Sequence, residues 1–175
     1  MLLVKNSEDP DLSPGPFGVL QVAEGEFTPE MEAVVASSGS DATAENIGAW
    51  GQAETVPGTE VTVFEYEDDV CLVDETRGTK MCGNTSRAQR GELFFAEPVA
   101  CDRVRVVGLV PDGTGKVMLE QEGRAGATVP VVSNLYEAEL PAVDTVLSDG
   151  TEETQVELPL KPFVRELPRC VGSEP

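Results

Sequence analysis

The sequence has no histidine among its 175 residues. Histidine is the usual general base near neutral pH and the commonest zinc ligand in proteins. Its absence excludes Ser-His-Asp and Cys-His nucleophilic catalysis by this chain alone. Basic residues are also scarce, with 12 Lys and Arg against 32 Asp and Glu and a formal net charge of −20. Because affinity for nucleic acid comes from clustered Lys and Arg, we expect no direct nucleic-acid binding.

Long apolar runs and the motifs of common enzymes are missing too. No segment approaches the ~20 apolar residues that a membrane-spanning helix needs. The sequence has no G-x-S-x-G elbow, no phosphate-binding loop and no G-x-G-x-x-G after a strand. Aromatic residues that could line a sugar-binding cleft are few, with six Phe, two Tyr and one Trp. We therefore predict a protein that is not an enzyme and holds no cofactor, and a hydrolase built on two carboxylates is the enzymatic alternative.

The acidic residues concentrate in the N-terminal part of the chain. Residues 1–76 contain 17 acidic residues and a single basic one, Lys5. We interpret residues 1–49 as an acidic, solvated arm with short helices. One helix is expected to start at Thr28-Pro29-Glu30, because Thr caps helices and Pro suits the first helical position. A cation-binding surface, or one that mimics nucleic acid and inhibits a basic protein, is the alternative interpretation, and a salt-adapted source would give the same acidic bias.

Short alternating strands separated by turn residues follow the arm. Val61 and Val63 alternate with polar residues, and Asp68-Asp69 then indicates a turn. Val110-Pro111-Asp112-Gly113 is a strong turn signal, and the face of the strand that carries Tyr136 is expected to be buried. The pattern predicts a mainly β protein, with an antiparallel β-sandwich or barrel-like domain over residues 50–160 and a proline-rich tail over residues 161–175.

The four cysteines are Cys71, Cys82, Cys101 and Cys170. None has the C-x-x-C spacing of a zinc knuckle or a redox motif. Their even number and the β-rich pattern favour disulfides and an oxidising compartment. Three pairings exist, and we favour Cys71–Cys82 across a hairpin with Cys101–Cys170 tying down the tail. Four buried free thiols in a cytosolic protein are the alternative.

The N-terminus does not resemble a secretory signal. Met1-Leu2-Leu3-Val4 is too short for the apolar part of such a signal, and Lys5 follows it directly. The cysteines and the β-rich pattern nevertheless favour an extracytoplasmic protein that is secreted, or anchored through a segment absent from this chain, and this chain is then expected to be the part left after a signal or anchor was removed.

Two charged segments are candidate interaction sites. Glu65, Glu67, Asp68 and Asp69 cluster at one turn and could supply oxygen ligands to calcium, although the EF-hand spacing is absent. A solvated turn explains the same residues without a metal. The one locally basic stretch, residues 86–90, could dock onto the acidic arm of the same or another chain, or form a polar loop.

One group of turn and strand residues suggests a family. Gly108-Leu109-Val110-Pro111-Asp112-Gly113 precedes Val129-Pro130-Val131, which in turn precedes Asn134 and Tyr136. This pattern over residues 101–158 resembles uncharacterised secreted or membrane-anchored β-rich proteins of actinobacteria. The resemblance implies a β fold and an extracytoplasmic location, and it carries no activity.

These observations favour a non-catalytic extracytoplasmic binding or scaffolding domain, with an unidentified protein partner. The acidic inhibitor and the carboxylate-based hydrolase are the alternatives.

Overall fold

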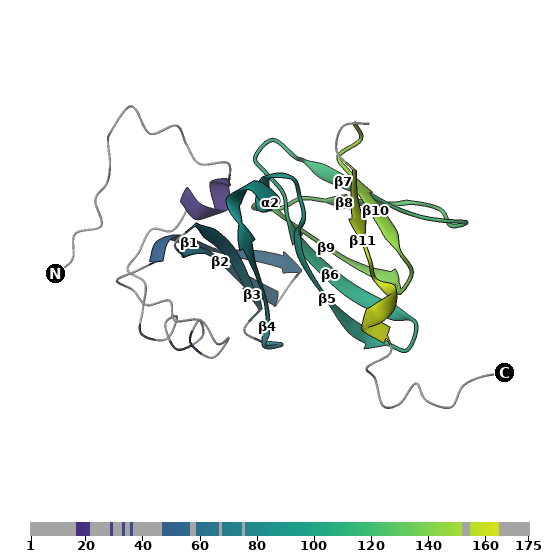
Figure 1. The fold of residues 1–175 in the computed structure, drawn as a ribbon, viewed down its shortest axis with the longest axis horizontal. Helices are drawn as coiled ribbons and strands as arrows, with labels where there is room; N and C mark the ends of the chain where they lie inside the picture. The colour runs from purple at the N-terminus through teal and green to yellow at the C-terminus, as the bar shows by residue number, and fades with distance from the viewer. Residues whose placement is uncertain are drawn as a thin grey trace.

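The structure is a computed structural model of the chain (Figure 1). It describes residues 17–21, 29, 33, 36, 47–56, 59–66, 68–74, 76–151 and 155–164. The described residues are mainly β, and every strand pair is antiparallel, which confirms the predicted fold class. The short helices predicted in the N-terminal arm lie almost wholly outside these residues.

The first sheet is a meander of four consecutive strands in the order β1-β2-β3-β4. The strands are β1 (Ile47–Val56), β2 (Thr59–Tyr66), β3 (Asp69–Asp74) and β4 (Thr79–Asn84). The predicted Asp68-Asp69 turn joins β2 to β3, with Tyr66 opposite Asp69 in the register. A short helix, α2 (Thr85–Gln89), follows β4, and the Asn84 side chain caps it by accepting a hydrogen bond from the Arg87 N–H at 2.9 Å.

The middle sheet has three strands in the order β5-β6-β9, and the third sheet has four in the order β11-β10-β7-β8. The middle strands are β5 (Leu93–Ala100), β6 (Arg103–Leu109) and β9 (Leu135–Pro141). The third sheet contains β7 (Lys116–Gln121), β8 (Ala127–Pro130), β10 (Thr145–Ser148) and β11 (Gln155–Leu158). Pro130 ends the edge strand β8, the position that its missing N–H favours. Two 3-10 turns, η1 (Gly18–Gln21) and η2 (Lys161–Val164), flank the strands.

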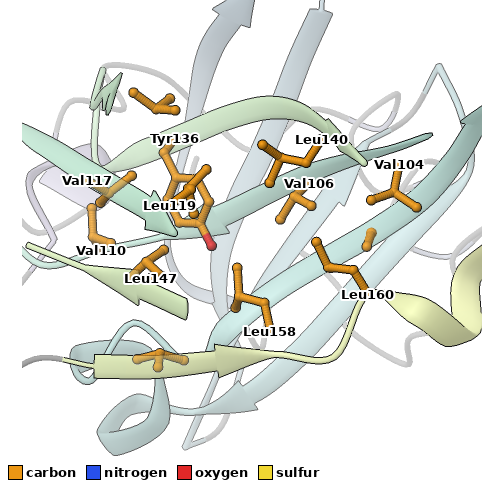
Figure 2. Packing of buried hydrophobic residues seen from close by; sticks show 13 residues of the cluster. Val104, Val106, Val110, Val117, Leu119, Tyr136, Leu140, Leu147, Leu158 and Leu160 are labelled. Atoms are coloured by element: carbon orange, nitrogen blue, oxygen red, sulfur yellow. The ribbon is translucent and has the colours of Figure 1, made fainter. Parts of the chain in front are cut away.

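The middle sheet is buried on both faces, so the described fold has three layers. One apolar cluster joins the first sheet to the middle sheet through residues such as Val63, Leu72, Phe95 and Leu109. The other joins the middle sheet to the third sheet (Figure 2). Tyr136 lies in this second cluster and is fully buried, as its strand face was predicted to be. Burial on both faces explains why β6 is apolar at every position from Val106 to Leu109.

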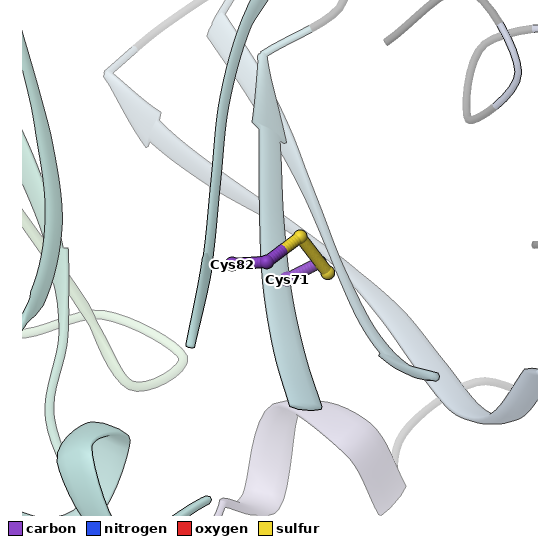
Figure 3. The surroundings of a disulfide bond; sticks show 2 residues. All are labelled: Cys71 and Cys82. Atoms are coloured by element: carbon purple, nitrogen blue, oxygen red, sulfur yellow. A yellow bond between two sulfur atoms is a disulfide. The ribbon is translucent and has the colours of Figure 1, made fainter. Parts of the chain in front are cut away.

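A disulfide joins Cys71 of β3 to Cys82 of β4, which confirms this predicted pair (Figure 3). The two residues lie directly opposite each other, with their Cα atoms 4.1 Å apart. Cys101 is also disulfide-bonded, and its predicted partner Cys170 lies outside the described residues. The outer face of the first sheet carries the Cys71 side chain together with Phe64, Val73 and the half-buried Trp50.

Candidate functional site

A groove runs along β5, the strand that ends the middle sheet within the described part of the chain. Its cavity has a volume of about 620 Å³. Strand β5 forms the floor, β4 and α2 form one wall, and β11 forms the other. The residues that line it are Thr79, Lys80, Met81, Arg87, Glu92, Phe94, Phe95, Ala96, Gln155, Val156, Glu157 and Pro159.

The groove exists because the described part of the middle sheet is one strand narrower than its neighbours. Met81 shows this most clearly, since it lies opposite Leu72, a core residue between the first and middle sheets. Its side chain therefore points toward the middle layer, yet it remains 36% exposed. A fourth middle strand beyond β5 would cover it. Phe94 is likewise only half-buried where it lines the groove.

The backbone of β5 presents hydrogen-bonding groups to this groove. Val110 donates its N–H to the Asn134 carbonyl on the β9 side of β6, at 2.9 Å. Backbone groups alternate along an antiparallel strand, so the N–H of Leu109 points to the other side, toward β5. Leu109 is opposite Leu93, and hence Leu93 bonds to β6 whereas Phe94 and Ala96 direct their N–H and C=O groups outward.

Pro98 continues the alternation that turns the backbone groups of Phe94 and Ala96 away from β6. It is opposite Val104 in the register, and its missing N–H is tolerated because that position faces away from β6. The open stretch of β5 is therefore short, and Pro98 marks its end.

The two walls of the groove differ in charge. Arg87 borders it on the side of the first sheet, and Glu157 is on β11 of the third; Lys80 is opposite Val73 in the register, so its side chain projects to the outer face of the first sheet. Glu92 pairs with Arg90 at 2.6 Å and with Arg87 at 3.5 Å. The hydrogen bond from Arg90 lowers the pKa of Glu92, and the same contact raises the pKa of Arg90.

A buried ion network fixes the β4 wall against β5. Arg105 of β6 is 2% exposed and contacts Asp74 at 2.8 Å, Glu97 at 2.7 Å and Glu137 at 2.5 Å. Burial alone lowers the pKa of Arg105, but the hydrogen bonds with these carboxylates outweigh it and leave the pKa raised. Among the described residues its Nη2 has no hydrogen-bond partner.

Glu97 extends this network to the turn that begins β4. It pairs with Arg77 at 2.9 Å and accepts a hydrogen bond from the Thr79 hydroxyl at 3.0 Å. The network therefore joins the end of β3, the β3–β4 turn and the start of β4 to the middle sheet.

The residues of the sequence motif hold the chain together around the N-terminal turn η1. Asp112 accepts the Gly18 N–H at 2.7 Å, and Asn134 accepts the Val19 N–H at 2.8 Å. The Asn134 amide also donates to Asp112 at 2.8 Å, and Phe17 is fully buried in the cluster below. Asp112 and Asn134 therefore bind backbone groups of the same chain, and this structural role accounts for their presence in the motif.

Gly108 and Tyr136 of the same motif pack on each other. They are opposite residues of β6 and β9, and a Cβ at Gly108 would collide with the Tyr136 ring. The Tyr136 hydroxyl is buried and has no hydrogen-bond partner among the described residues. Burial raises the pKa of Tyr136 above its ordinary value.

The candidate calcium residues are only partly placed by the structure. Asp68 and Asp69 are exposed at the β2–β3 turn, Glu65 is half-buried in β2, and Glu67 lies outside the described residues. The part of the chain that is described contains no group of three or more Asp, Glu or Cys that could hold a metal ion.

The groove itself was not among the sites predicted from the sequence. Pro98 was a usable signal, because a proline inside a strand indicates an edge. The exposure of Met81 depends on which strand ends the middle sheet, and the residues near Met81 in sequence do not predict that strand order.

No protein-family model matches the chain, and no curated protein or solved structure matches it either. No helix among the described residues is long and apolar enough to cross a membrane.

Proposed function

We propose that this protein is a non-catalytic, extracytoplasmic binding domain whose groove accepts an extended segment of a partner protein. The segment would add to β5 as a further strand of the middle sheet. The observation that carries this proposal is the outward-facing backbone of Phe94 and Ala96, at the floor of a groove flanked by the edges of both outer sheets. Strand addition to an open sheet edge is a recurrent mode of peptide recognition.

The apolar side chains around the groove support the same conclusion. Soluble proteins usually protect exposed strand edges with proline, charge or a covering segment. Pro98 protects one end of β5, but among the described residues nothing covers the edge at Phe94 and Ala96, and Met81 stays exposed beside them. A bound segment would bury these side chains and satisfy the outward backbone groups together.

The polar clusters described above support a non-catalytic role. Arg105 and its carboxylates lie in the interior, where they join the sheets, and Asp112 and Asn134 bind backbone groups. The Cys71–Cys82 disulfide supports an oxidising location, which agrees with a secreted protein or one anchored through a segment outside this chain.

A neutral test peptide examines this proposal directly. We would titrate the protein into a fluorescein-labelled peptide of alternating Val and Thr with Gly-Ser ends, and follow binding by anisotropy. The same peptide with two central residues replaced by Pro cannot form a strand, and it should not bind.

Two variants provide a matched pair, because Met81 and Val132 are both large, exposed apolar residues at 36% and 49%. Met81→Glu places a charge in the groove and should weaken binding about tenfold, through lost apolar contact and the desolvation of a carboxylate. Val132→Glu introduces the same charge outside the groove and should leave affinity unchanged. Equal affinities of the two variants, or no binding by the Val-Thr peptide, would contradict the proposal.

A further inference from the structure

A strand added beside β5 would lie in the middle layer, between the first and third sheets. The side chains of β5 alternate between these two neighbours. Leu93 and Phe95 pack in the cluster that joins the middle sheet to the first, and Phe94 and Ala96 pack in the cluster that joins it to the third. Side chains of an added strand would alternate in the same way, so consecutive residues would contact different outer sheets.

The wall formed by the first sheet is apolar where it faces this position. Met81 points toward the middle layer and remains 36% exposed, and Phe95 lines the groove on the same side. Lys80 precedes Met81 and is opposite Val73, which belongs to the cluster on the outer face of the first sheet. Its side chain therefore points away from the groove.

The wall formed by the third sheet is apolar as well. Val156 lies in the same apolar cluster as Phe94 and Ala96, and all three line the groove. Gln155 and Glu157 alternate with Val156 along β11 and are exposed. Their side chains therefore point to the outer face of the third sheet.

Among the described residues that line the groove, each charged side chain is either paired or turned outward. Arg87 pairs with Glu92 at 3.5 Å, and Glu92 pairs more closely with Arg90, at 2.6 Å. Lys80 and Glu157 point to the outer faces of their sheets. A charged residue of a bound segment would lose hydration here without gaining an ionic partner. The groove therefore complements an uncharged segment.

Strand β6 shows which residues this layer accepts. It pairs on both sides, with β5 and β9, and every residue from Val106 to Leu109 is buried and uncharged. Arg105, its one buried charged residue, is neutralised by three surrounding carboxylates. A strand on the other side of β5 would meet the same two outer sheets, and so it requires the same apolar sequence.

The recess also favours an extended segment over the β5 edge of a second copy. Paired strands lie about 4.8 Å apart. Since β5 is the floor of the groove in each copy, the walls formed by β4 and β11 would hold two β5 strands farther apart than that.

We propose, resting on the strand-addition function above, that the groove binds an extended protein segment whose consecutive residues are apolar and uncharged. Alternate residues of the segment face Phe94 and Val156, and the residues between them face Met81 and Phe95. The open stretch of β5 ends at Pro98, so the apolar run is short. The partner is thus a protein that exposes a short run of consecutive apolar residues in extended form.

Three labelled peptides of equal length and identical Gly-Ser ends test the two faces separately. Their central residues are all Val, alternating Val and Thr, or all Thr, and each is kept at nanomolar concentration to limit self-association. Val and Thr are both β-branched, so the peptides differ mainly in hydroxyl groups. The all-Val peptide should bind about tenfold more tightly than the Val-Thr peptide, because the second face of the Val-Thr strand buries hydroxyls against apolar side chains. The all-Thr peptide should bind most weakly.

A variant on the first-sheet side and a matched control assign this preference to the groove. Met81→Gln keeps the length of an exposed side chain and makes it polar. It should reduce the preference for the all-Val peptide over the Val-Thr peptide from about tenfold to about threefold. Val132→Gln makes a similar change at an exposed residue outside the groove and should preserve the preference. Circular dichroism would check that both variants are folded.

Two charged peptides test the exclusion of charge. Peptides that alternate Val with Glu, or Val with Lys, should both bind more weakly than the Val-Thr peptide at the same ionic strength, because neither charge finds a partner in the groove.

The outcomes separate the two proposals. Equal binding of the all-Val and Val-Thr peptides, or a preference that Met81→Gln leaves unchanged, would overturn the apolar assignment and leave strand addition intact. Tighter binding of either charged peptide than of the Val-Thr peptide would also overturn it. A dimer in analytical ultracentrifugation that dissociates as the all-Val peptide binds would assign the groove to a second copy and overturn the choice of partner. Absence of binding by every peptide would overturn the proposed function itself.

Discussion

The buried hydroxyl of Tyr136 predicts that removing it stabilises the protein. The side chain is fully buried against Gly108, and its hydroxyl has no hydrogen-bond partner among the described residues. A buried polar group without a partner costs about 1–3 kcal/mol. Tyr136→Phe keeps the ring and removes that group, so the free energy of unfolding should rise by about 1–2 kcal/mol, and Tm by about 3–6 °C.

The gain in stability from Tyr136→Phe should grow with pH, because the pKa of Tyr136 is higher in the folded protein than in the unfolded chain. Burial raises this pKa in the folded protein, whereas the unfolded chain ionises near the ordinary value of about 10. The unfolded state of the wild type therefore gains stability above pH 10, and the folded state does not. Each pH unit above 10 should widen the difference between Tyr136→Phe and the wild type by up to about 1.4 kcal/mol.

Urea unfolding followed by the fluorescence of Trp50, the one tryptophan, measures both effects. Tyr66→Phe is the control, because Tyr66 is the other tyrosine and is half-buried on the first sheet. The Tyr66→Phe variant should show no gain in the free energy of unfolding. A loss of more than about 1 kcal/mol in Tyr136→Phe at pH 7, with no change between pH 9 and 11, would show that the hydroxyl is satisfied and refute this reasoning.

Three further predictions concern the parts that hold the sheets together. Gly108→Ala should destabilise the protein by about 1–3 kcal/mol, because its Cβ would displace the buried Tyr136 ring; wild-type stability in urea would contradict that packing. Arg105→Met should cost about 3–5 kcal/mol at pH 7, since it leaves buried carboxylates without their cation, and a loss below about 1 kcal/mol would show that the network is solvated. Cys71→Ala with Cys82→Ala opens a loop with a sequence separation of 11 and should cost about 3 kcal/mol, measurable as a lower urea midpoint, whereas an unchanged midpoint would mean that the disulfide adds no stability.

Local patterns predicted much of the individual strands. The alternation around Tyr136 identified its buried face, and the hairpin around Cys71 and Cys82 predicted their disulfide. Each of these features depends on residues close together in sequence. Turn chemistry and a period of two residues are therefore sufficient to predict them.

The layering and the groove depend on contacts that no local pattern contains. Arg105 interrupts an apolar strand, and only the three sheets together show that Asp74, Glu97 and Glu137 surround it. The sequence predicts a turn at Asp112 and places Asn134 in a pattern of turn and strand residues, but their bonds to Gly18 and Val19 span about a hundred positions in sequence. The groove arises because β5 ends the middle sheet between β4 and β11, which is a property of strand order.

Hydrogen exchange along β5 tests strand addition most directly. The protein would be exchanged with and without the neutral Val-Thr peptide, and protection followed for each amide by nuclear magnetic resonance. The account predicts that the amides of Phe94 and Ala96 become protected when the peptide binds, while Leu93 and Phe95, already bonded to β6, stay protected throughout. Binding without new protection of Phe94 and Ala96, or with protection confined to another edge such as β8, would contradict it.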